Sequence, residues 1–146
     1  MTKVFLASDH AGYELKEALG PFLSERGFEV ADLGPATLDP NDDYPDYLGQ
    51  LGRSVADNKG SFGIGIGHSG QGEAMAVNRS LGARAAVYYG GPEEILKLSR
   101  QHNDANVLSL GAHFMSADEA KKAVEVWLAT PFSGEERHVR RIQKLG

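Results

Sequence analysis

The stretch GSFGIGIGHSGQGEAMAVNR (residues 60–79) spells out one strand, one glycine-rich turn and one helix in direct succession. The apolar run from Ser61 to Ile66 predicts a buried strand, and the residues from Gln71 to Arg79 predict the helix that follows it. The same order, a short apolar run and then a longer amphipathic segment, recurs along the chain. Such alternation is typical of a parallel sheet with helices on both faces.

The flanking sequence supplies the remaining elements of this predicted sheet. Ser116 and Glu119 have the spacing of a capping box, which marks a helix start. Pro131 ends that helix, and a polar segment after it predicts a final C-terminal helix. Further strands are expected at 4–7, 28–33, 84–88 and 106–110, and further helices at 15–23, 44–55 and 92–98. The sequence therefore predicts one α/β domain over residues 1–146, with a five-stranded parallel sheet and an additional C-terminal helix.

The composition narrows the function classes. The chain has 146 residues, a net charge of −5 and no cysteine, so disulfides, thiolate metal sites and cysteine nucleophiles are excluded. An acidic chain is a poor general binder of nucleic acid, so no nucleic-acid partner is expected. The sequence contains no apolar run of about 18 residues, the length a membrane span needs, and no signal-peptide pattern. We therefore expect a cytoplasmic protein without a membrane partner.

The predicted sheet also says where a ligand should bind. In open parallel sheets, ligands bind outside the carboxyl ends of the strands. Four segments follow strands in this way, and the candidate site is expected among them: Ser8–His10, Gly67–Glu73, Tyr88–Gly91 and Gly111–His113.

The glycine-rich turn fits none of three familiar motifs. Gly65 to Gly70 matches G-x-G-x-x-G, but it follows the third strand and has no acidic residue about 20 positions later. Glu73 occupies the lysine position of a phosphate-binding loop, where a carboxylate would repel nucleotide phosphates. Gln71 breaks the G-x-S-x-G pattern around Ser69, so a serine hydrolase is only a weak alternative. A tight turn without any ligand is a further alternative.

Glu73 suggests a more specific chemistry. A carboxylate in the first turn of a helix, beside free backbone N–H groups, combines a general base with an oxyanion hole. Abstraction of a proton next to a carbonyl group requires both. The simpler interpretation is a helix N-terminal charge that the helix dipole favours.

Other charged residues are candidates with structural alternatives of their own. Asp9 and His10 end the first strand, where they either contact a ligand or form a polar turn. His102 is either an acid–base group or a cation at a helix C-terminus. Arg137 and Arg141 are four residues apart on one helix face, so they either clamp a phosphate or form a solvated surface. The five histidines lack the spacing of a metal site, and no metal is expected.

Four longer motifs occur in order along nearly the whole chain: SDHAG (8–12), DYP (43–45), GHSGQGE (67–73) and SRQHNDANVL (99–108). With these motifs the sequence resembles the ribose-5-phosphate isomerase B family, which with the galactose-6-phosphate isomerase subunits interconverts aldose and ketose phosphates. The resemblance implies a Rossmann-like fold and a cofactor-free, metal-independent isomerase that works through a cis-enediolate. It also implies a homodimer, or a dimer of dimers, with shared active sites.

The resemblance also implies individual roles. Glu73 is the base that moves the proton between C1 and C2, and Ser69 with the amides of Gly70 and Gly72 stabilises the enediolate. His102 assists ring opening with Asp9 as its partner. Asn103 contacts substrate hydroxyls, and Tyr44 lines the pocket. His10, Arg137 and Arg141 hold the phosphate. The residues around His102 come from the neighbouring subunit.

Two positions depart from the family pattern. Gly67 stands where many members carry a cysteine base, which indicates the branch that uses a carboxylate. His113 stands where an arginine commonly helps to bind phosphate, so the phosphate site has less permanent charge. Conversion of ribose 5-phosphate to ribulose 5-phosphate is the expected reaction. The alternatives are isomerisation of a tetrose or hexose phosphate and non-catalytic binding of a sugar phosphate.

Overall fold

The computed structural model describes residues 1–146 and contains five strands and six α-helices. The strands are β1 (Lys3–Ser8), β2 (Glu29–Asp32), β3 (Phe62–Gly67), β4 (Ala85–Tyr88) and β5 (Val107–Gly111). The helices are α1 (Tyr13–Glu25), α2 (Tyr44–Asp57), α3 (Gln71–Val77), α4 (Glu94–Gln101), α5 (Ala117–Ala129) and α6 (Glu136–Leu145). Two short 3₁₀ turns, η1 (His10–Gly12) and η2 (Ala112–Phe114), follow β1 and β5. Every predicted element is present, with ends that differ by a few residues.

All neighbouring strands are parallel, in the order β2-β1-β3-β5-β4. Ser8 pairs with Ile66, and Gly67 pairs with Gly111, so β1, β3 and β5 end at the same edge. The second strand, β2, lies on one side of β1, and the next strand along the chain, β3, lies on the other side of β1. The carboxyl ends of β1 and β3 therefore flank the topological switch point, where open α/β sheets bind ligands.

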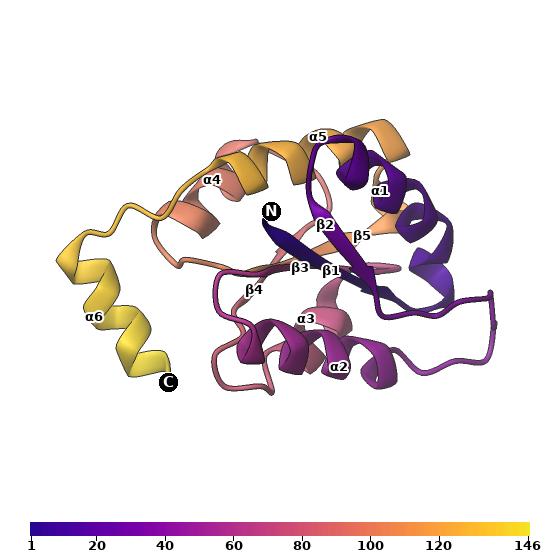
Figure 1. Cartoon of the computed structure of the whole chain (residues 1–146), viewed down its shortest axis with the longest axis horizontal. Helices are drawn as coiled ribbons and strands as arrows, with labels where there is room; N and C mark the ends of the chain where they lie inside the picture. The colour runs from indigo at the N-terminus through magenta and orange to yellow at the C-terminus, as the bar shows by residue number, and fades with distance from the viewer.

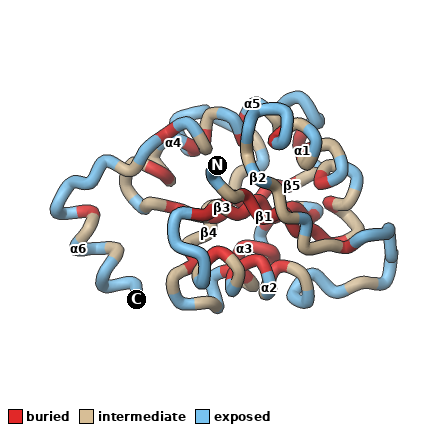
Figure 2. The backbone as a smooth tube through the Cα atoms, viewed as in Figure 1, coloured by how far each residue is buried: buried red, intermediate tan, exposed pale blue.

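Helices cover both faces of the sheet, as predicted. Figure 1 shows α1, α4 and α5 over one face and α2 and α3 over the other, and Figure 2 shows the buried residues concentrated along the strands between these layers. The larger core contains Trp127 and Leu108 and packs against α1, α4 and α5. The smaller core contains Phe5 and Leu51 and packs against α2 and α3. No helix is long and apolar enough to span a membrane.

The strand β3 has different side chains on its two faces. Ile64 and Ile66 belong to the larger core, whereas Gly63, Gly65 and Gly67 face α2 and α3. A Cβ atom at Gly65 would lie 2.7 Å from a methyl group of Leu48. These three glycines therefore permit close packing against the strand. This part of the glycine-rich stretch is therefore a packing surface within the strand, and the turn itself begins after Gly67.

The two ends of the chain differ in how tightly they pack. The predicted capping box at α5 is confirmed, because Ser116 Oγ accepts from the Glu119 N–H and the Glu119 carboxylate accepts from the Ser116 N–H. The helix α6 stands apart from the sheet in Figure 1, and only His138 in it is buried. Its predicted position in the sequence is confirmed, but it adds no layer to the domain.

Candidate active site

Glu73 lies at the carboxyl end of β3, in the first turn of α3, and only 4% of it is exposed. A side chain at Gly67 would occupy the volume that the Glu73 carboxyl group fills. Gly70, with a φ of 82°, forms the left-handed turn that starts α3, a conformation that favours glycine. Glycine at both positions therefore allows the Glu73 side chain to fold back over the end of β3.

The surroundings of Glu73 suit a general base. Burial raises the pKa of the Glu73 carboxyl group, and the negative charge of Asp9 raises it further. The backbone N–H groups of Glu73 and Gly70 and the imidazole of His68 partly offset this rise. A base with a raised pKa is closer to the operating pH, which improves proton transfer.

The loop around Glu73 is held by a hydrogen bond from β5 and lies against the ring of Tyr44. The buried Ser109 hydroxyl of β5 donates to the Gly70 carbonyl at 2.7 Å, which fixes the turn. The Ser69 hydroxyl accepts from the Gln71 N–H at 3.2 Å and makes no hydrogen bond to an imidazole. The arrangement that a serine nucleophile needs is therefore absent. The Tyr44 ring lies so close to Gly72 that a Cβ there would approach it to 2.8 Å.

Asp9 and His10 lie beside this loop, at the end of β1. Asp9 is 7% exposed, and its Oδ1 accepts from the Gly12 N–H at 3.2 Å. Asp42, from the segment before α2, lies 2.7 Å from His10 Nδ1. Ligand atoms of Asp9, His10 and Asp42 lie within 4.8 Å of one another, a spacing that a metal ion could bridge. Asp9 already accepts a hydrogen bond from Gly12, and Asp42 is already bonded to His10. A metal-free site stays a prediction.

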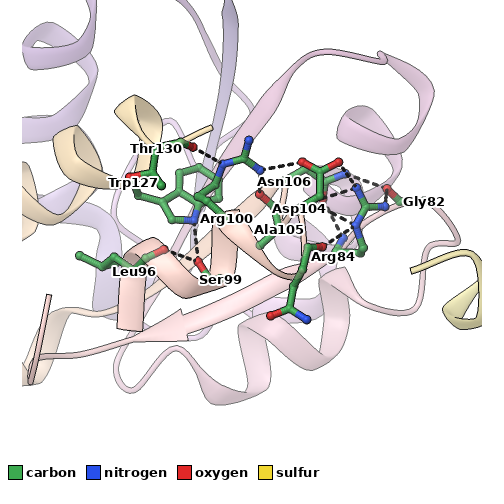
Figure 3. Close-up of polar contacts among 11 residues, drawn as sticks. Gly82, Arg84, Leu96, Ser99, Arg100, Asp104, Ala105, Asn106, Trp127 and Thr130 are labelled. Atoms are coloured by element: carbon green, nitrogen blue, oxygen red, sulfur yellow. Dashed lines mark hydrogen bonds and ion pairs between the residues drawn. The ribbon is translucent and has the colours of Figure 1, made fainter. Parts of the chain in front are cut away.

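His102 and Asn103 occupy a different part of the molecule. They end α4, which runs back from the carboxyl end of β4 to the amino end of β5. Asp104, with a positive φ of 44°, follows them in a turn. Figure 3 shows this turn between two arginines: Arg100 reaches the Asp104 carboxylate at 2.9 Å, and Arg84 reaches the Asp104 carbonyl at 2.9 Å. The turn that carries His102 and Asn103 is therefore rigidly held.

The helix α6 lies next to this turn. His138 is 5% exposed and stacks on His102, with ring centroids 4.4 Å apart. Burial lowers the pKa of His138, and the neighbouring His102 and Arg137 lower it further. Arg137 and Arg141 are exposed on α6. The four residues His102, His138, Arg137 and Arg141 thus form a second group of polar side chains.

The two groups lie at opposite edges of the sheet, one where the strands have their carboxyl ends and the other where they have their amino ends. Asp9, His10, Ser69 and Glu73 lie where β1 and β3 end, whereas His102 precedes the start of β5. In Figure 1, α6 projects at one end of the molecule and the turn after β1 lies at the other. An interpretation in which all candidate residues share one strand-end surface of a single chain is therefore wrong. The predicted order already places His102 between a helix and the next parallel strand, and such turns lie at the amino ends of the strands.

His113 lies at the same edge as Glu73, in η2 after β5. The His113 ring stacks on the His68 ring with centroids 4.3 Å apart, and the His113 backbone N–H donates to the His68 carbonyl at 3.1 Å. Phe114 and Tyr89 extend this exposed aromatic group, with centroids 5.3 Å apart. Of the segments predicted at this edge, Tyr88–Gly91 lies farthest from β1, because β4 is the outermost strand.

Comparison with known proteins identifies the family. A model described as Ribose/Galactose Isomerase matches residues 4–145. The chain is 40% identical over 144 residues to a ribose-5-phosphate isomerase B of Mycobacterium tuberculosis, covering 98% of this chain and 87% of the relative. The chain belongs to the ribose/galactose isomerase family.

Further relatives agree with this family. A probable ribose-5-phosphate isomerase B of Mycoplasma pneumoniae is 41% identical over 142 residues, which cover 97% of this chain and 91% of the relative. Ribose-5-phosphate isomerase B of Mycoplasma genitalium, solved with bound ribulose 5-phosphate, superposes with a TM-score of 0.93 at 40% identity. That match covers 99% of this chain and 93% of the solved one. The resemblance found in the sequence motifs is therefore confirmed.

Three residues at the two groups were not anticipated from the sequence. Asp42 holds His10, His138 stacks on His102, and His68 stacks on His113. His68 lies within the motif at 67–73, directly after β3, and Asp42 adjoins the motif at 43–45, but neither motif indicates which side chains they contact. His138 lies between Arg137 and Arg141, and its helical spacing alone gives no sign that it is buried.

Proposed function

We propose that this chain isomerises ribose 5-phosphate to ribulose 5-phosphate through a cis-enediolate, without a metal or cofactor. The observation that carries the proposal is the buried Glu73 carboxyl group, which fills the space over Gly67 beside the amides of the turn. Family membership supports the substrate class, because relatives at 40–41% identity carry the name ribose-5-phosphate isomerase B.

Glu73 would act as the base and then as the acid. Its carboxylate takes the proton from C2 of the open-chain aldose, and the C1–C2 double bond forms as electrons move onto the carbonyl oxygen. The amides of Gly70 and Gly72 and the Ser69 hydroxyl would stabilise the enediolate oxygens. The proton of the C2 hydroxyl group passes to the C1 oxygen, so the negative charge moves to the C2 oxygen. Protonated Glu73 then returns the carbon-bound proton to C1 as the C2 oxygen becomes the ketose carbonyl, and the carboxylate is regenerated.

The remaining predicted roles belong to the same proposal. Asp9 and His102 would move the proton that opens the sugar ring, and Asn103 and Tyr44 would contact hydroxyl groups. His10, His113, Arg137 and Arg141 would hold the phosphate, because charged nitrogen donors bind phosphate oxygens strongly. The arginines lie at the opposite edge of the sheet from Glu73, so one chain cannot supply the whole set.

A homodimer with shared active sites resolves this separation. We propose that the α6 end of one subunit lies over the Glu73 edge of its partner. A two-fold axis makes this contact reciprocal, so both active sites are completed at once. Exposed apolar side chains such as Met75, Leu81 and Leu145 support burial against a second copy. A dimer of dimers and a cytoplasmic location stay predictions of the same proposal.

Isomerisation of a different sugar phosphate is the second candidate. The observation that favours it is the stacked pair His68 and His113, which places two imidazole rings at the edge where Glu73 lies. With a histidine in place of the usual arginine at position 113, this edge carries less permanent positive charge. Such a site would suit a sugar whose phosphate lies at another distance from the reacting carbons, as in a tetrose or a hexose phosphate.

The reaction can be tested with purified protein in deuterium oxide. We expect turnover of ribose 5-phosphate with deuterium incorporated at the carbon that receives the proton, and unchanged rates after treatment with EDTA. Tetrose and hexose phosphates assayed in parallel identify the preferred substrate by kcat/KM. Binding without turnover or deuterium exchange would indicate a non-catalytic sensor, and strong inhibition by EDTA would contradict the metal-free mechanism.

A further inference from the structure

The His10 side chain is held by a single carboxylate from a distant part of the chain. His10 Nδ1 lies 2.7 Å from Asp42 Oδ1, and the His10 backbone N–H donates to the same oxygen at 3.1 Å. The Asp42 side chain is only 5% exposed, whereas the His10 side chain is 39% exposed. The pair therefore has a buried anionic end and an open imidazole end.

Asp42 is itself fixed by the segment that connects β2 to α2. The Asp42 N–H donates to the Asp39 carbonyl at 3.2 Å, and the Asn41 N–H donates to the Asp39 carboxylate at 3.0 Å. At the other end of the segment, the Ser8 N–H donates to the Gly34 carbonyl at 3.1 Å, which ties the segment to β1. The Asp42 carboxylate is thus a fixed point against which the His10 ring can be oriented.

The hydrogen bond determines which nitrogen of His10 is free. A carboxylate only accepts, so Nδ1 carries the proton of this bond and Nε2 remains for a ligand. The bond to Asp42 is the largest cause that raises the pKa of His10, and burial partly opposes it. Asp9 and Asp39 are the other charged groups facing the ring, and both raise the pKa further.

The second oxygen of Asp42 strengthens this effect. Asp42 Oδ2 is buried and has no hydrogen-bond partner in the chain. A buried carboxylate with one unsatisfied oxygen is stable only beside a positive charge. His10 is the cationic group that contacts the Asp42 carboxylate, through Oδ1, so the two side chains favour the form in which the imidazole is protonated.

We propose that Asp42 is a positioning residue for substrate binding, which fixes the His10 ring so that protonated Nε2 faces the phosphate group. This role rests on the proposed function, in which His10 binds the phosphate. Asp42 does not itself touch the substrate. Asp9, whose Oδ1 is bonded to the Gly12 N–H, does not share this role.

The variant Asp42→Asn tests the role. We expect KM for ribose 5-phosphate at pH 8 to rise about tenfold, since a charge-assisted hydrogen bond is lost, while kcat stays within about twofold. The inhibition constant of inorganic phosphate should rise by the same factor. At lower pH, where His10 becomes protonated in the variant as well, the two KM values should converge. An NMR titration should show a lower His10 pKa in the variant.

Two further variants make the outcome decisive. Asp39→Asn removes a carboxylate of the same segment that makes no hydrogen bond to His10 and is the smallest of the causes that raise its pKa, so we expect it to change KM less than twofold. In a His10→Asn background, Asp42→Asn should have no additional effect on KM. An unchanged KM in the single variant, or an equal rise in the His10→Asn background, would overturn the role of Asp42. If the parent turns over no sugar phosphate, the proposed function fails, and the His10 titration still tests the pair.

Discussion

At the scale of single residues, the chemistry of this protein depends on one buried carboxyl group. Glu73 is nearly inaccessible, lies against Gly67 and is surrounded by the amides of its own turn. An ordinary helix N-terminal glutamate would point into solvent, so the burial of Glu73 favours its interpretation as a general base. Burial raises its pKa and thereby moves the base toward neutrality, at a cost in folding free energy.

Glu73→Gln is expected to separate chemistry from binding. The amide has the same shape but cannot accept the proton, so kcat should fall about 100- to 10,000-fold with KM near the parent value. In the parent, kcat should fall on the acid side through a pKa above the usual value of glutamate, because only the ionised carboxylate is a base. Steady-state kinetics from pH 4 to pH 9 measure both effects. Full activity in the variant would exclude Glu73 as the base.

The same variant should be more stable than the parent at neutral pH. The pKa of Glu73 is raised by folding, so the unfolded state favours the ionised form more than the folded state does above the usual pKa. The parent therefore loses stability as pH rises through the folded-state pKa, and the glutamine variant does not. Thermal unfolding should show a higher Tm for Glu73→Gln at pH 8 and a smaller difference near pH 4. A lower Tm at pH 8 would contradict this linkage.

At the scale of elements, β3 determines how closely α2 and α3 approach the sheet. Its glycines on one face leave room for buried side chains, and its isoleucines on the other face fill the larger core. A Cβ at Gly63 would lie 2.9 Å from a Val55 methyl group and 3.0 Å from a Leu51 methyl group. The position of the site therefore depends on the absence of side chains along one face of one strand.

Gly63→Ala should lower the free energy of unfolding by about 1–3 kcal/mol, the usual range for overpacking a core. Gly20→Ala in the interior of α1 is the matched control, because its Cβ would meet Leu6 only at 3.8 Å. That substitution should stabilise the protein by up to about 1 kcal/mol through helix propensity. Denaturant unfolding measures both variants. A stabilising Gly63→Ala would show that α2 does not pack as closely as described.

At the scale of the whole molecule, one chain presents two incomplete groups of polar residues at opposite edges of its sheet. Shared sites in a dimer predict that two inactive variants can complement each other. Mixing Glu73→Gln with His102→Asn through an unfolding and refolding step yields dimers of which about half are mixed. Each mixed dimer contains one intact site, so about a quarter of the parental activity should return. No recovery, with mixed dimers demonstrated by mass spectrometry, would mean that Glu73 and His102 do not meet across subunits.

The sequence by itself determined the elements and the chemical type of the site. Periodicity and turn residues are local properties, so all five strands, the capping box of α5 and the position of Glu73 after β3 could be predicted. The motifs were specific enough to indicate the family, which the comparisons confirm. The site residues predicted next to strand ends, Asp9, His10 and Glu73, do lie at one edge.

Only the tertiary structure decided which groups meet. Strand order depends on contacts between distant segments, so the sequence could not show that β1 and β3 flank the switch point or that α6 lies beside the turn of His102. The partner of His10, Asp42, comes from a segment without regular structure and carries no local signal. The raised pKa of Glu73 likewise results from burial and from Asp9, a residue 64 positions away along the chain. Long-range packing, which no local pattern encodes, turns a helix-end glutamate into a candidate base.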